Sequence, residues 1–107
     1  MIGKKVQKAI NTQINKEFYS AYLYLAMSAD ADLKGFKGAG KWFRAQYQEE
    51  VDHALKFMDY LMSQRAAVEL DAVPKPPASF ASLPDMFQKT LEHEQFVTKS
   101  INGLMRL

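Results

Sequence analysis

The sequence predicts an all-α fold, an antiparallel helix bundle in which a long crossover joins the second helix to the third. Apolar residues recur at helical spacing in three segments, which is the pattern of amphipathic helices. Only five glycines and four prolines occur in 107 residues, and most of them fall in two places. A chain of this length is expected to form one domain, residues 1–107, with a modest core.

The first two helices are expected over residues 4–32 and 41–64, with a turn over residues 33–40. Three of the five glycines lie in that turn: Gly35, Gly38 and Gly40. Because a short connection joins helices that lie side by side, the first two helices are expected to be antiparallel neighbours.

A long connection over residues 66–81 contains three of the four prolines and cannot be helical throughout. The third helix is expected to begin at Ser82, as the N-cap, with Pro84 in the first turn and Asp85 completing a capping box. Its apolar pattern persists to Leu107. A connection this long can return along the whole bundle, so the third helix is expected to run parallel to the second.

Four potential metal ligands lie on the inward stripes of these helices: Glu17 on the first, Glu50 and His53 on the second, and Glu94 on the third. Glu50 and His53 are one helical turn apart, so both side chains can reach one point. Burying an unpaired carboxylate costs several kcal/mol. Three helices with that cost at one level of the bundle indicate a shared cation, and a pair of iron ions fits best.

Each of these residues alone has a simpler interpretation. A single glutamate on a helix is usually exposed to solvent, and a single histidine among aromatic residues is more often a hydrogen-bonded core residue. A Glu-x-x-His motif also occurs by chance in helical proteins. The metal hypothesis depends on the joint pattern, because three inward glutamates on three helices are in step with one histidine.

Composition excludes several other classes. The chain has no cysteine, which rules out disulfides and thiolate metal sites. A net charge of +2 is too small to indicate nucleic-acid binding, and the lysine clusters near the start and the first turn are expected to be solvated. The longest apolar run, residues 21–27, is too short to cross a membrane, and the first residues show no signal peptide. We therefore expect a cytoplasmic protein.

Four segments, residues 15–25, 48–54, 75–77 and 91–95, resemble the non-haem prokaryotic ferritins of the ferritin-like superfamily. The resemblance covers the whole chain, and its motifs are specific because all the ligands arrive in register. It implies a four-helix bundle with a short fifth helix that assembles into hollow 24-subunit cages. It also implies iron storage and detoxification, in which Fe(II) is oxidised by oxygen or peroxide at a di-iron ferroxidase centre and stored as ferric mineral.

By position, the resemblance implies that Glu17 and His53 bind the first iron. Glu50 corresponds to the bridge between the two irons, and Glu94 corresponds to a ligand of the second iron. Carboxylates are hard oxygen donors and imidazole also suits iron, so these residue types agree with that assignment.

Three further positions matter to the resemblance. Glu49 matches an acidic residue that helps to bind a third iron in several bacterial members, although it could equally be a surface glutamate. Tyr24 matches a tyrosine that can donate an electron during oxidation, and packing in the core is compatible with that role. The haem-binding relatives have methionine directly after the bridging glutamate, whereas this chain has Val51, so no haem is expected.

The main departure from the family is length, because the family's chains continue beyond this one. The domain is expected to be truncated within the third helix, with the fourth and fifth helices missing and an apolar groove exposed. Either a longer chain or a second copy in a dimer or small oligomer would then complete the bundle. Arg65 and Ala66 stand where the family often has two glycines, so the second helix is expected to fray or continue.

Two other function classes remain open. A di-iron oxidase or peroxidase of the rubrerythrin kind would use similar ligands, but it usually has a second Glu-x-x-His motif and often a cysteine-rich iron domain. A helical module without productive iron chemistry would keep the ligands without the activity. Oxidation of Fe(II) separates the first two classes from the third, and accumulation of a ferric core separates storage from a simple oxidase.

Overall fold

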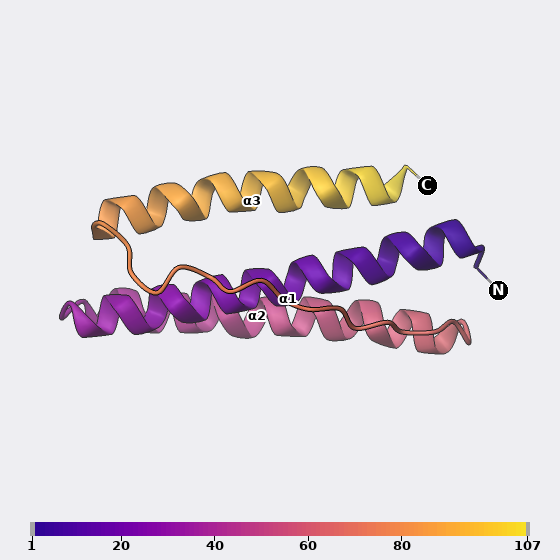
Figure 1. The fold of residues 1–107 in the computed structure, drawn as a ribbon, viewed down its shortest axis with the longest axis horizontal. Helices are drawn as coiled ribbons and strands as arrows, with labels where there is room; N and C mark the ends of the chain where they lie inside the picture. Colours follow the sequence, from indigo (N-terminus) through magenta and orange to yellow (C-terminus); the bar gives the residue numbers. More distant parts are fainter. Residues whose placement is uncertain (1, 107) are drawn as a thin grey trace.

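The computed structural model describes residues 2–106, which form three helices and no strand. The helices are α1 (Lys4–Leu33), α2 (Lys37–Ser63) and α3 (Leu83–Met105). α1 and α2 pack side by side in opposite directions, and α3 runs along α1 in the same direction as α2 (Figure 1). The predicted all-α bundle with a long crossover is confirmed, as is the parallel course of the second and third helices.

The first turn is shorter than the sequence predicts, because α2 begins at Lys37 rather than residue 41. Gly35 has a φ of 88°, so it is a true turn glycine. Gly40 lies inside α2, where a Cβ atom would sit 3.3 Å from the backbone oxygen of Ser28 on α1. The Ser28 hydroxyl also donates a hydrogen bond to the Gly40 carbonyl oxygen at 2.7 Å. Gly40 therefore allows the two helices to approach closely, and its assignment to the turn was wrong.

The second helix ends sharply, contrary to the expectation that it would fray or continue. Arg65 takes a left-handed conformation with φ 56°, and the Ala66 N–H donates to the Leu61 carbonyl at 2.9 Å. This is the Schellman arrangement that usually places glycine at the position of Arg65. The backbone hydrogen bonds are satisfied without glycine, at the cost of a less favourable Arg65 conformation.

Side chains of α1 hold the crossover against the bundle. Asn11 donates to the Ala67 carbonyl at 3.0 Å and accepts from the Glu69 N–H at 2.8 Å, while Asn15 donates to the Ala72 carbonyl at 3.2 Å. These bonds replace backbone partners that an extended segment lacks. The crossover lies along the length of α1 and α2 before it reaches α3 (Figure 1).

An ion pair between Lys34 and the buried carboxylate of Asp30 fixes the far end of the crossover. Lys34 donates to Asp30 at 2.6 Å and to the Phe80 carbonyl, and the Phe80 N–H donates to Asp30 at 3.0 Å. The Lys34 ammonium beside it lowers the pKa of Asp30 below its usual range. α3 then begins with the predicted cap, since the Ser82 hydroxyl accepts from the Asp85 N–H at 3.2 Å.

The core lies mainly between α1 and α2, in two clusters at different levels of the bundle. One cluster contains Ile10, Ile14 and Leu61, and the other is built around Tyr24 and Phe43. α3 adds few buried residues, namely Met86, Thr90 and Val97. Its predicted inward stripe is only partly buried, because Phe87, Leu91 and Met105 are exposed. None of the helices described is long and apolar enough to cross a membrane.

Candidate metal centre

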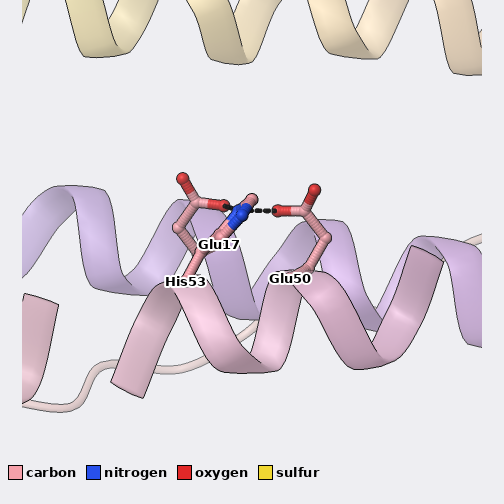
Figure 2. Close-up of side chains that lie close together, drawn as sticks. All are labelled: Glu17, Glu50 and His53. Atoms are coloured by element: carbon pink, nitrogen blue, oxygen red, sulfur yellow. Dashed lines mark ion pairs between the residues drawn. The ribbon is translucent and has the colours of Figure 1, made fainter. Parts of the chain in front are cut away.

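Three of the predicted ligands meet between the two core clusters. α1 provides Glu17, and α2 provides Glu50 and His53 from successive turns (Figure 2). One ligand atom from each residue lies within 4.8 Å of the others. The His53 Nδ1 atom is 3.8 Å from the Glu17 Oε2 atom and 3.7 Å from the Glu50 Oε2 atom. The predicted convergence of these two helices on one point is therefore present in the fold.

Both carboxylates are withdrawn from water. Glu17 is 0% exposed and Glu50 is 4% exposed, whereas the His53 side chain is about half-exposed. The Oε2 atom of each glutamate has no hydrogen-bond partner among the residues described. A buried acceptor without a partner costs about 1–3 kcal/mol, and more when it is charged. Two such atoms facing one imidazole make a donor set that suits a hard cation such as iron.

The electrostatics of Glu50 reflect this crowding. Burial, followed by the neighbouring Glu17 carboxyl, raises the pKa of Glu50 from 4.5 to about 9. The charges of Glu94 and Glu49 act in the same direction. Without a cation, the Glu50 carboxyl therefore holds a proton at neutral pH. A bound cation would replace that proton, because only the carboxylate form is a good ligand.

Glu94 approaches the site from α3 but lies outside the three-residue group. The Tyr24 hydroxyl donates a hydrogen bond to Glu94 Oε1, which links α1 to α3 at this level. Burial, and then that bond to Glu94, raises the pKa of the Tyr24 phenol far above its ordinary value. Glu49 is exposed on α2 beside Glu50.

The sequence did not indicate a second contact that fixes α3 here. His93 Nε2 lies 2.6 Å from the Ser20 Oγ atom, and the Ser20 hydroxyl reaches the Lys16 carbonyl at 2.9 Å. Burial lowers the pKa of His93, so its imidazole is neutral and can donate from Nε2 to Ser20 while Ser20 donates to Lys16. No local spacing could predict this pair, because its members are 73 residues apart.

Gln13 was also missed. It is buried on α1, and its side-chain amide donates to Glu17 Oε1 at 3.0 Å. A signal was available in the sequence, because residues four apart on a helix are neighbours and glutamine can bond to an acidic group at that spacing.

Comparison with known proteins agrees with this arrangement. A family model described as the ferritin-like domain matches residues 7–107. The chain belongs to the ferritin family. It is 50% identical over 105 residues to the bacterial non-heme ferritin of Campylobacter jejuni. That match covers 98% of this chain and 63% of the relative. It is 36% identical over 104 residues to the bacterial non-heme ferritin of Escherichia coli, covering 97% of this chain and 63% of that relative.

Solved ferritins also share the fold. The open pore ferritin from the hyperthermophilic archaeon Archaeoglobus fulgidus superposes with a TM-score of 0.97 at 43% sequence identity. The match covers 99% of this chain and 65% of that one. The chain thus spans less than two thirds of the length of these relatives.

Proposed function

We propose that this protein binds Fe(II) at the centre formed by Glu17, Glu50 and His53, oxidises it, and stores the ferric product within a homo-oligomeric cage. The observation that supports this most directly is the pair of buried carboxylate oxygens without hydrogen-bond partners among the described residues. Membership of the ferritin family supports the same function.

Iron is the substrate in this proposal. Glu17 and His53 bind one Fe(II), Glu50 bridges it to a second, and Glu94 binds the second from α3. Each Fe(II) gives up one electron, and molecular oxygen takes up both electrons with two protons to form hydrogen peroxide. A bridging carboxylate suits this reaction because it keeps both metal ions near one oxidant. The few protein ligands leave positions open for oxidant and for release of the ferric product.

Further assignments belong to the same proposal. Tyr24 holds Glu94 through its hydrogen bond. As an electron donor, its phenol would give one electron and a further Fe(II) the other when hydrogen peroxide is reduced to two water molecules with uptake of two protons. Glu49 is available to a third iron because it is exposed one residue from Glu50. The site is expected to hold two irons and no haem, and the protein to reside in the cytoplasm. The names of the relatives favour storage over a rubrerythrin-like oxidase.

The test is aerobic oxidation of Fe(II), followed by the absorbance of the ferric product. Glu50→Ala and His53→Ala are expected to slow the initial rate at least tenfold. Asp52→Ala, on the same helix but exposed, is the matched control and should keep the parental rate. Rapid oxidation in both site variants would show that the chemistry occurs elsewhere. Oxidation without a growing ferric core would favour the oxidase alternative.

A further inference from the structure

The two oxygens of Glu17 have different surroundings. Oε1 accepts the hydrogen bond from Gln13 at 3.0 Å, whereas Oε2 has no hydrogen-bond partner in residues 2–106. Oε2 is also the oxygen that faces His53, at 3.8 Å from Nδ1. The carboxylate is thus held with one oxygen engaged by the protein and the other directed at the proposed metal position.

Gln13 is well placed to impose this orientation. It is 3% exposed, and it lies one turn before Glu17 on the same helix, so its side chain has little freedom to turn away. The amide presents its nitrogen, and not its oxygen, to Glu17 Oε1 at 3.0 Å. A bond that fixes a ligand in this way commonly changes metal affinity 10–100-fold when it is removed.

We propose that Gln13 is a positioning residue that makes Glu17 a one-oxygen ligand. By occupying Oε1, the amide keeps Glu17 from chelating the metal ion through both oxygens. The first ion therefore keeps an additional open coordination position, which an incoming oxidant can use. This inference rests on the proposed metal centre and adds to it a residue that controls the coordination number.

The test uses Co(II), whose visible absorption per ion is strong at low coordination number and weak in six-coordinate sites. Gln13→Met removes the N–H donor while keeping an unbranched side chain of good helix propensity. With Met at position 13, the Co(II)-saturated protein is expected to absorb less per bound ion as Glu17 binds through both oxygens.

Gln88→Leu is the matched control, because Gln88 donates to Glu92 at 3.4 Å with the same spacing on the exposed face of α3. It should keep the parental spectrum and affinity. Gln13→Leu provides a second variant that lacks the N–H donor and has good helix propensity, should Gln13→Met lose its helical circular dichroism. A parental spectrum at saturation in whichever position-13 variant is folded would overturn the inference.

The two proposals fail in different ways. A parent protein that binds no Co(II) would contradict the metal centre itself, and the inference would fall with it. A parent that binds Co(II) while the folded position-13 variants keep its spectrum would leave the centre intact and contradict the role of Gln13 alone.

Discussion

At the residue scale, the fold buries Glu17 and Glu50 and leaves the Oε2 atom of each without a hydrogen-bond partner among the described residues. Their positions could be predicted because helical periodicity alone puts Glu17 and Glu50 on buried stripes, with His53 one turn further. The residues that hold them were harder to predict. Gln13 resembles any polar residue of a helix, and the contact between Ser20 and His93 depends on how α3 lies against α1.

The raised pKa of Glu50 makes metal binding depend on pH. In the metal-free protein the Glu50 carboxyl holds a proton below about pH 9. Metal binding at Glu50 must therefore displace that proton. Affinity for Co(II) should rise by up to about tenfold per pH unit between about pH 6 and pH 8, with release of about one proton from this group. Calorimetry in buffers of different ionisation enthalpy measures both the Co(II) affinity and the number of protons released. Glu50→Gln should weaken binding and reduce this slope, and an equal slope in that variant would contradict the assignment.

Raising the pH is expected to strengthen metal binding through Glu50, but it destabilises the metal-free protein through the same carboxyl group. A pKa raised from 4.5 to about 9 on folding contributes stability at low pH that is lost as pH rises through this range. The metal-free protein with Glu50→Gln should therefore be more stable than the parent near pH 8, by about 1 kcal/mol or more, and the difference should shrink near pH 6. Urea unfolding at both pH values measures it. Lower stability of the variant near pH 8 would show that burial of Glu50 is not costly.

At the scale of the elements, helix type and order could be predicted, but the start of α2 and the form of the cap at its end could not. A glycine signals either a turn or a close approach, and only the structure shows that Gly35 serves the first purpose and Gly40 the second. The sharp cap at the end of α2 was not predicted, because a left-handed arginine such as Arg65 is uncommon. The capping box at Ser82 was predictable, because it depends on residues three apart.

The close approach at Gly40 gives a paired test. Gly40→Ala would place a methyl group 3.3 Å from the backbone oxygen of Ser28, which lies in a rigid helix. Gly38→Ala meets nothing within 4 Å and should gain helix propensity of up to about 1 kcal/mol. Chemical unfolding should show the Gly38 variant more stable than the Gly40 variant by about 1 kcal/mol or more. Equal stabilities would mean that α1 and α2 can separate without cost.

The left-handed residue after α2 gives a second test. Arg65→Gly should raise the free energy of unfolding by about 0.5–1 kcal/mol, because glycine takes this conformation without steric cost. Gln64→Gly, one residue earlier with φ −91°, should instead lower it, since glycine there only adds freedom to the unfolded chain. Thermal unfolding of both variants checks the order. A less stable Arg65→Gly variant would contradict the role assigned to this turn.

At the scale of the whole molecule, the topology could be predicted from the lengths of the two connections. α2 and α3 leave a groove of about 570 Å³ that is mostly apolar. Residues of all three helices line it, including Phe57, Tyr60, Ile101, Leu104 and Met105. Glu17 and His53 also line this groove, so whatever covers it also bounds the proposed metal centre.

An uncovered groove of this kind is expected to be buried in the assembled protein. Native mass spectrometry should therefore show an oligomer. Leu104→Asp should raise the dissociation constant of that oligomer by about tenfold or more, because one buried leucine contributes about 1.5–3 kcal/mol. Leu33→Asp is the control, because Leu33 is 84% exposed at the end of α1. A parent that is monomeric, or an assembly unaffected by Leu104→Asp, would contradict this expectation.

The most direct test of the metal centre is anomalous X-ray diffraction at the iron edge from crystals treated with Fe(II) in the absence of oxygen. We expect one peak among Glu17, Glu50 and His53 and a second between Glu50 and Glu94. Peaks only elsewhere, or none among the first three residues in crystals that have taken up iron, would contradict it.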